Sequence, residues 1–177
     1  MNVCVYGAAS DDIDPAYLRA GEALGGALAE NGIGLVFGGG AHGMMGAAAR
    51  GAAGKGGTVI GVAPRFFDKP GILFDKCTRF VFTETIRQRK QYMEDQSDAF
   101  IVTPGGIGTM EEFFEMLTLK TLGRTQKPIV LYNIKGYFDP LCEMLSLSAA
   151  KGFLPRENLQ AFYVSADPDA VLRYILR

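Results

Sequence analysis

The sequence has few of the residues that disulfide, zinc or histidine-based chemistry would need. Its three cysteines, Cys4, Cys77 and Cys142, are odd in number, widely spaced and outside any CxxC pair. We therefore expect neither a disulfide framework nor a zinc site. His42 is the only histidine, and its place in an expected loop favours a structural or incidental role over a catalytic one. No metal ion or organic cofactor is implied.

The sequence also lacks long apolar runs and an excess of one charge. No run approaches the roughly twenty residues of a membrane span, and the start, MNVCVYGAAS, lacks the apolar length and basic flank of a signal peptide. The net charge of −1 provides no basic field to gather nucleic acid or an anionic membrane. We expect a cytoplasmic protein that binds neither, and any bound anion must be held by local geometry.

Short apolar runs alternate along the chain with helical patterns. The expected strands are nearly continuously apolar: Val3–Tyr6, Leu35–Phe37, Val59–Val62, Phe80–Phe82, Phe100–Val102, Ile129–Tyr132 and Phe162–Val164. The expected helices repeat their apolar residues at helical spacing: Ala16–Glu30, Met44–Ala53, Thr85–Gln96, Thr109–Leu122, Phe138–Ala150 and Pro168–Ile175. This alternation predicts an α/β fold, with a parallel sheet covered by helices on both faces. Without a repeat or linker, residues 1–177 are expected to form one domain.

Ligands of such sheets bind beyond the carboxyl ends of the strands, and the first glycine-rich loop there is VFGGGAHGMMGAAARG (residues 36–51). Residues 38–43 fit GxGxxG, but no acidic residue follows the next strand, so the dinucleotide interpretation fails. GAAGKGG is no phosphate-binding P-loop either, because Lys55 precedes a glycine. Two alternatives remain for Gly40 and Gly43. They belong to a turn whose N–H groups bind an anion, or to tight helix–strand packing without a ligand.

The second glycine-rich loop, TPGGIGTMEE, follows the apolar run AFIV. Gly105, Gly106 and Gly108 remove side chains from the approach to the backbone. Thr109 and Glu112 also fit the T-x-x-E capping box. In this motif the Thr109 side chain would cap the following helix, and the Glu112 side chain would accept a hydrogen bond from the Thr109 backbone N–H. The capping box explains Glu112 but not the three glycines. Two glycine-rich loops at one edge of a sheet suggest a ligand with a phosphate and a further group attached.

A basic cluster lies just upstream, in TETIRQRKQYMEDQSD. Arg87, Arg89 and Lys90 fall at the start of an expected helix, the wrong end for stabilisation by the helix dipole. One alternative is that the three side chains form a solvated charged face. The other is that Arg89 and Lys90 face the glycine-rich loops and bind an anion there. Arginine suits this role because its guanidinium binds phosphate or carboxylate in a bidentate manner.

These segments resemble the Lonely Guy family. The resemblance lies in GGGAHGMMG, in RK followed by Met93, and above all in PGGxGTxxE from Pro104 to Glu112, and it extends to about Leu154 through KPIVLYNIKGYFDPL and AAKGF. Members are cytokinin riboside 5′-monophosphate phosphoribohydrolases, long mislabelled as lysine decarboxylases. The resemblance implies a Rossmann-like fold and a homodimer. It also implies cleavage of the N-glycosidic bond of a nucleoside 5′-monophosphate, such as AMP or an N6-modified AMP, into free base and ribose 5-phosphate.

The family's functional positions can be carried onto matching residues of this chain. Its catalytic pair falls on Arg89 and Glu112. The positions implied in substrate and phosphate binding, together with those of the first glycine-rich loop, are Gly40, Gly43, Lys90, Gly105, Gly106, Ile107, Gly108, Thr109, Glu111 and Thr118. Two segments depart from the pattern. GAAS replaces the usual Gly-Ser-Ser after the first strand and leaves Ser10 there, and PRFFDKPGILFDK lacks an acid found in plant members.

A chemical hypothesis follows for these residues. Glycosidic cleavage passes through an oxocarbenium-like state, which a carboxylate near the anomeric carbon stabilises; Glu112 is the candidate, and it would also orient or deprotonate water. Glu115 lies one turn on, so we expect the two carboxylates to couple and one pKa to rise. The phosphate would bind the amides of residues 105–109. Arg89 would hold the ribose phosphate region or stabilise the departing charge.

Three alternatives to hydrolysis are open at this point. A non-catalytic nucleotide carrier or sensor on the same fold would bind nucleoside monophosphates without releasing a base. A lysine decarboxylase would need pyridoxal phosphate on a lysine, and the short chain offers no evident site for it. A nicotinamide dehydrogenase is disfavoured by the missing acidic residue.

The expected helix around EEFFEMLTLKTL also predicts a homodimer. Phe113, Phe114, Leu117 and Leu119 cover more of its circumference than one sheet face can bury. We therefore expect part of this apolar surface to be covered by a second copy.

Overall fold

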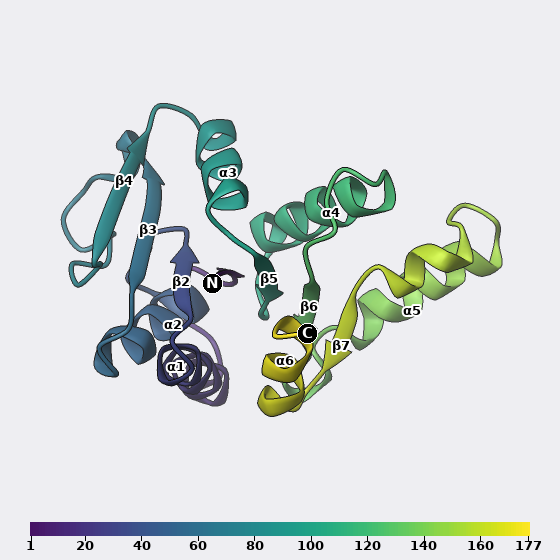
Figure 1. The fold of residues 1–177 in the computed structure, drawn as a ribbon, viewed down its shortest axis with the longest axis horizontal. Coiled ribbons are helices and arrows are strands. Elements are labelled where there is room, and N and C mark those ends of the chain that lie inside the picture. The colour runs from purple at the N-terminus through teal and green to yellow at the C-terminus, as the bar shows by residue number, and fades with distance from the viewer.

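The computed structural model describes residues 1–177. All seven strands form one parallel sheet in the order β4-β3-β2-β1-β5-β6-β7, with helices on both faces (Figure 1). The strands are β1 (Asn2–Tyr6), β2 (Gly34–Phe37), β3 (Val59–Pro64), β4 (Arg79–Thr83), β5 (Ala99–Val102), β6 (Ile129–Tyr132) and β7 (Tyr163–Ser165). The expected α/β, Rossmann-like fold is confirmed.

Six α-helices cover the sheet. They are α1 (Pro15–Glu30), α2 (Gly43–Gly54), α3 (Ile86–Asp95), α4 (Ile107–Thr121), α5 (Asp139–Ala150) and α6 (Pro168–Ile175). Short 3₁₀ turns lie at Arg65–Phe67, Ile134–Gly136 and Arg156–Gln160. None of the helices combines the length and the apolar character needed to cross a membrane.

The core has two halves, one on each face of the sheet. Alternate residues of β1 point to opposite faces, so Val3 and Val5 pack with α1, α2 and α6, whereas Cys4 and Tyr6 pack with α3, α4 and α5. Both faces of the central strands are therefore apolar. This explains why these strands read as continuous apolar runs rather than alternating ones.

Helices α1 and α2 touch through their backbones. A Cβ atom on Gly25 would lie 1.9 Å from the carbonyl oxygen of Ala48, and one on Gly51 would lie 1.9 Å from that of Glu22. Only glycine permits so close a crossing. The two helices consequently pack as one unit beneath β1 and β2.

The strand order reverses direction at β1. Its neighbours are β2 on one side and β5 on the other, so the chain leaves the carboxyl ends of these strands toward opposite faces. In α/β sheets a crevice opens at such a point, and ligands bind there. The glycine-rich loops after β2 and β5 lie at this edge.

The expected capping box at the start of α4 is wrong. This helix begins at Ile107, two residues before Thr109, its N-cap is Gly106, and no side chain caps it. A capping box forms instead at α3, where Thr85 Oγ1 accepts from the Gln88 N–H and the Gln88 side chain accepts from the Thr85 N–H.

The apolar residues of α4 are also more buried than expected. Phe113 and Leu117 belong to the core beneath the helix, and Phe114 and Leu119 are partly buried against it. The sheet and the neighbouring helices therefore cover most of the apolar surface that was expected to contact a second copy of the chain.

Candidate active site

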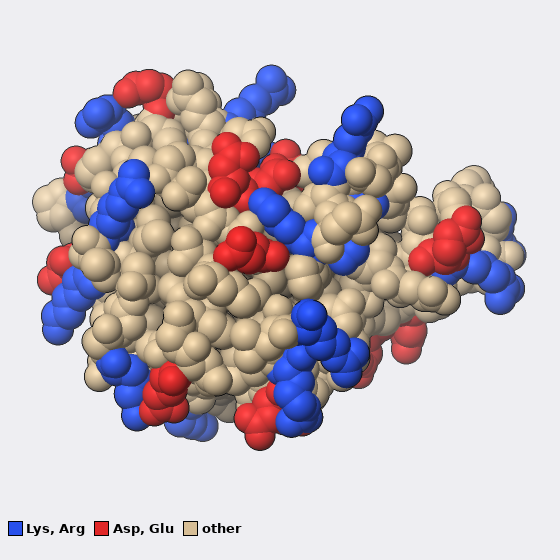
Figure 2. All heavy atoms as spheres, viewed as in Figure 1, with Lys and Arg blue, Asp and Glu red and all other residues tan.

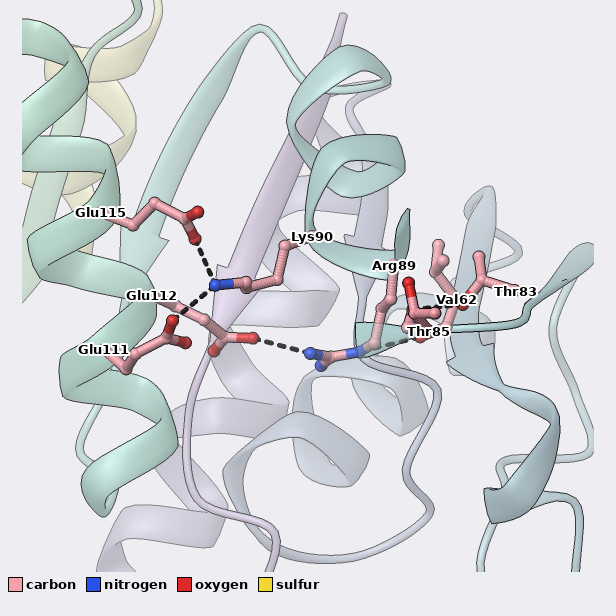
Figure 3. Close-up of polar contacts among 8 residues, drawn as sticks. All are labelled: Val62, Thr83, Thr85, Arg89, Lys90, Glu111, Glu112 and Glu115. Atoms are coloured by element: carbon pink, nitrogen blue, oxygen red, sulfur yellow. Dashed lines mark hydrogen bonds and ion pairs between the residues drawn. The ribbon is translucent and has the colours of Figure 1, made fainter. Parts of the chain in front are cut away.

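Arg89 and Glu112 form a buried ion pair at the carboxyl edge of the sheet. Arg89 Nη1 donates to Glu112 Oε1 at 2.9 Å, and Arg89 Nε donates to the carbonyl oxygen of Val62 at 3.2 Å. The two charged side chains are only 14 % and 8 % exposed. Figure 3 shows the guanidinium reaching from α3 toward the carboxylate on α4. A charge-assisted hydrogen bond between buried partners fixes both groups in place.

Burial raises the pKa of Glu112 above its ordinary value, and the Arg89 guanidinium limits that rise. Among neighbouring carboxylates, Glu111 contributes to the rise. The expected coupling between Glu112 and Glu115 is wrong, because the Glu115 carboxylate lies 2.8 Å from Lys90 Nζ instead. Glu112 is thus a carboxylate held in a poorly solvated place by one arginine.

Lys90 binds two carboxylates on the outer side of α4. Its Nζ lies 2.5 Å from Glu111 Oε1 and 2.8 Å from Glu115 Oε2, an arrangement visible in Figure 3. Burial lowers the pKa of Lys90, but the two carboxylates outweigh it and leave the pKa raised. Lys90 therefore stays protonated, and it ties α3 to α4 beside the Arg89–Glu112 pair.

The ion pair lies in the wall of a cavity of about 600 Å³. Its lining comes from the loops after β1, β2, β3 and β5 and from the starts of α2, α3 and α4: Gly7, Ala8, Ala9, Gly38, Gly40, His42, Met45, Phe67, Ile72, Leu73, Ile86, Arg89, Gly106, Gly108, Thr109, Glu111 and Glu112. This volume is in the range of small-molecule sites. Apolar side chains form one part of the wall, and the glycines and the ion pair form the other.

The start of α4 presents bare backbone to this cavity. Gly106 and Gly108 have no atom near the place where a Cβ would be, whereas a Cβ on Gly105 would lie 2.1 Å from Thr109 Oγ1. Gly105 is therefore a packing glycine, and only the other two keep the approach open. The first-turn N–H groups of an uncapped helix lack partners within the helix and carry its positive dipole end. Such a helix start is suited to binding an anion.

The start of α2, by contrast, is already satisfied by the chain itself. The Gly43 N–H donates to Asp11 Oδ1 at 2.7 Å, and His42 binds Asp11 Oδ2 through Nδ1 at 2.5 Å and the Gly71 carbonyl oxygen through Nε2 at 2.9 Å. Hydrogen bonds to Asp11 and Gly71 raise the pKa of His42. His42 thus links three loops that line the cavity, and these contacts support a structural role. His42 and Gly43 lie 31 and 32 residues from Asp11, so no local pattern in the sequence predicts these contacts.

Gly38 provides space for the arginine. A Cβ at this position would lie 2.1 Å from Arg89 Nη2, so any larger residue would displace the guanidinium. In the sequence this glycine opens the GxGxxG match whose dinucleotide interpretation fails. The structure places it beneath the side chain that pairs with Glu112.

The remaining candidate residues lie outside the cavity lining. Met93 is fully buried in the core, Ile107 is 90 % exposed, Thr118 is exposed further along α4, and the Ser10 hydroxyl accepts from the Asp12 N–H. Gly40 lines the cavity, but Gly43 does not.

The apolar wall of the cavity is formed by residues that no sequence motif indicates. Phe67, Ile72 and Leu73 come from the loop between β3 and β4, and Met45 and Ile86 from the starts of α2 and α3. The loop is pinned by backbone hydrogen bonds from the Ala41 N–H to Ile72 and from the Phe74 N–H to Gly39. These pairs are more than thirty residues apart, and irregular loop sequence gives no periodic signal of them.

Neither sign of charge covers the face of the molecule shown in Figure 2. In Figure 2, Lys and Arg side chains are interspersed with Asp and Glu, and broad uncharged areas separate them on the face shown. With a net charge of −1, the protein has no extended positive field. Selectivity for an anion must come from the amides and side chains of the cavity.

Three relatives of this chain carry the same activity name, and the matching family model carries another. A family model described as "Possible lysine decarboxylase" matches residues 45–175. A cytokinin riboside 5′-monophosphate phosphoribohydrolase of Rhodococcoides fascians is 38% identical over 160 residues, which are 90% of this chain and 81% of that protein. One of Mycobacterium marinum is 37% identical over 171 residues, 97% and 91% of the two chains. The rice protein with this name and the suffix LOG is 34% identical over 164 residues, 93% and 67%. The chain belongs to the Lonely Guy family.

Solved structures place this Lonely Guy protein in a wider group of the same fold. A molybdenum cofactor binding protein of Rippkaea orientalis aligns with a TM-score of 0.75 at 23% identity, covering 99% of this chain and 94% of that one. The molybdenum cofactor carrier protein of Chlamydomonas reinhardtii aligns with a TM-score of 0.72 at 25% identity, covering 99% and 97%. The sheet and its helices are thus shared more widely than the activity name of the closer relatives.

Proposed function

We propose that the protein hydrolyses the N-glycosidic bond of adenosine 5′-monophosphates, N6-modified or not, to the free base and ribose 5-phosphate. The observation that carries this proposal is the buried Arg89–Glu112 pair in a cavity that also receives the uncapped start of α4. One part of such a site suits a phosphate and another a developing cation. The shared name of relatives that are 34–38% identical supports the same activity.

The reaction adds one water molecule across the bond. The glycosidic bond breaks with its electron pair going to the base, and the anomeric carbon becomes cation-like. Glu112, held ionised by Arg89, stabilises that cation and accepts a proton as water attacks. The departing base takes up one proton, so the products are neutral base and ribose 5-phosphate. The phosphate binds the first-turn amides of α4.

The lysine decarboxylase description fits this site poorly. Forming a Schiff base requires a neutral lysine amine, and Lys90 is the lysine beside the ion pair. Its two carboxylate partners raise its pKa and keep it charged. Lys90 serves better as the tie between α3 and α4.

Release of free base tests the proposed function. Purified protein is incubated with a panel of nucleoside 5′-monophosphates, including AMP and a prenylated AMP, and the products are separated by chromatography. We expect free base and ribose 5-phosphate in equal amounts. The carrier alternative has support from the fold shared with molybdenum cofactor carrier proteins, but at lower identity. Tight nucleotide binding without any released base would favour it.

Replacing Arg89 with Ala should lower kcat/KM by more than tenfold, because a charge-assisted contact contributes about 1.5–3 kcal/mol. Loss of the arginine also leaves the buried Glu112 carboxylate unpaired, which favours its protonation. The control is Arg87→Ala, since Arg87 is exposed on the same helix and should tolerate truncation. Steady-state kinetics of both variants measure the difference. Equal losses in the two would contradict the assignment.

We also infer a homodimer. The residues that support it lie on and after α5, because the apolar residues of α4 are largely buried within the chain. Large apolar side chains remain exposed on and after α5: Met144 is 49 % exposed, Leu147 58 % and Phe153 87 %. In Figure 1, α5 and the segment after it project beyond the rest of the chain. A second copy would cover them. Light scattering at micromolar concentration should give twice the chain mass; a fully active monomer would dismiss this inference.

A further inference from the structure

Tyr137 reaches the phosphate-binding turn from a neighbouring loop. Its hydroxyl donates to the carbonyl oxygen of Gly105 at 2.6 Å. Tyr137 follows the 3₁₀ turn after β6, whereas Gly105 lies between β5 and α4. The two strands are neighbours in the sheet, so their loops meet at its carboxyl edge. This hydrogen bond joins them beside the cavity, although Tyr137 itself is not part of the lining.

The tyrosine ring is held in place by its neighbours. It makes edge-to-face contacts with Tyr17, at a centroid distance of 6.3 Å, and with Phe138, at 5.1 Å. Lys135 lies over the Tyr17 ring and pairs with Asp14 at 2.6 Å, which ties the loop after β6 to the start of α1. The hydroxyl therefore comes from a supported side chain rather than a free one.

The Gly105 carbonyl matters because of the peptide to which it belongs. A trans peptide is planar, so the carbonyl of Gly105 and the N–H of Gly106 point in opposite directions. The carbonyl is bound by Tyr137, which lies outside the cavity lining, whereas Gly106 is part of that lining. With glycine on both sides of this peptide, no Cβ atom of its own residues restricts rotation of the plane. A flipped plane would present a carbonyl oxygen to an anion in place of an N–H donor.

We propose that Tyr137 is a positioning residue that locks the Gly105–Gly106 peptide with its N–H toward the bound phosphate. The proposal rests on the proposed function, since it assumes that the substrate phosphate binds the start of α4. Tyr137 is not among the residues that line the cavity, so we expect no direct contact with the base or the reacting carbon. Its effect is therefore confined to ligands that carry the phosphate.

The test compares Tyr137→Phe, which removes only the hydroxyl, with wild type. We expect kcat/KM for AMP and the affinity for the product ribose 5-phosphate to fall about fivefold to tenfold, the weight of one hydrogen bond. Activity on adenosine and inhibition by adenine should stay unchanged. The matched control is Tyr163→Phe, whose ring stacks on Tyr174 outside the cavity and which should behave as wild type throughout.

Two results would overturn the proposal. One is no change with any ligand, and the other is an equal loss with AMP and adenosine, which would mean a general structural effect. If wild-type protein releases no base from any nucleotide, the proposed function fails but Tyr137 is still tested. The affinity for AMP is then measured by calorimetry in place of the kinetics. An affinity of Tyr137→Phe equal to that of wild type would contradict the positioning role of Tyr137.

Discussion

Replacing Glu112 with Gln is expected to lower turnover by at least about a thousandfold while the fold stays nearly intact. Gln has almost the same shape and its carbonyl oxygen can still accept the hydrogen bond from Arg89. It cannot carry negative charge, so neither the cation-like state nor the attacking water is assisted. The measurement is single-turnover release of base from AMP, alongside thermal unfolding to show that the variant is folded.

Glu157→Gln provides the matched control, because Glu157 is exposed in a distant 3₁₀ turn. It should keep full activity. Near-normal turnover in Glu112→Gln would move Glu112 to a purely structural role and remove the centre of the proposed mechanism.

The pH dependence of activity and of stability, compared between wild type and Glu112→Gln, also reports on Glu112. Burial raises its pKa, so wild-type activity should fall, as the pH drops, at a pH above the 4.5 of an ordinary glutamate. The stability effect has the opposite sense. The folded protein holds the proton more tightly than the unfolded chain, so ionising Glu112 costs stability as the pH rises through its folded pKa. Glu112→Gln should lack that part of the pH dependence.

The second large effect concerns the substrate rather than the protein. AMP should be cleaved with a kcat/KM roughly a thousandfold higher than adenosine, and a prenylated AMP similarly exceeds its riboside. The uncapped start of α4, with Gly106 and Gly108 open to the cavity, offers several backbone N–H groups to one anion. The protein's net charge of −1 would not attract an anion by itself. Binding the phosphate there positions the reacting bond, so its removal lowers the rate as well as the affinity.

Paired assays of nucleotide and nucleoside under identical conditions measure this difference. Adding inorganic phosphate to the nucleoside reaction is a useful control, since it can fill the empty anion position. Comparable efficiency on AMP and adenosine would point to a plain nucleosidase and would remove the anion site from the mechanism.

The sheet and its helices could be predicted because local sequence determines them. Buried strands such as Val3–Tyr6 and Ile129–Tyr132 are apolar throughout, and the helices repeat their apolar residues at the right spacing. The start of α4 was misplaced because Thr109 and Glu112 match a capping box. Nothing local reveals that Glu112 turns instead toward Arg89, 23 residues away.

The candidate site was predictable only where a motif names its residues. The resemblance names Arg89 and Glu112 as candidates, but it does not give the geometry that holds them. Gly38 and the carbonyl of Val62 fix the guanidinium, and each becomes its neighbour only when β2, β3 and α3 assemble. Likewise, the pairing of Asp11 with His42 joins two loops that share no periodicity. Such contacts are consequences of the tertiary fold.

The glycine contacts between α1 and α2 restrict how this protein can change during evolution. Gly25 and Gly51 face carbonyl groups of the opposite helix, so selection can accept almost no other residue unless both helices move. Since α2 begins at the cavity with His42 as its N-cap, such a movement would reach the candidate site. A library of random variants should therefore show inactive members with changes on the far side of the sheet. Distance from the substrate is a poor guide to mutational tolerance in this chain.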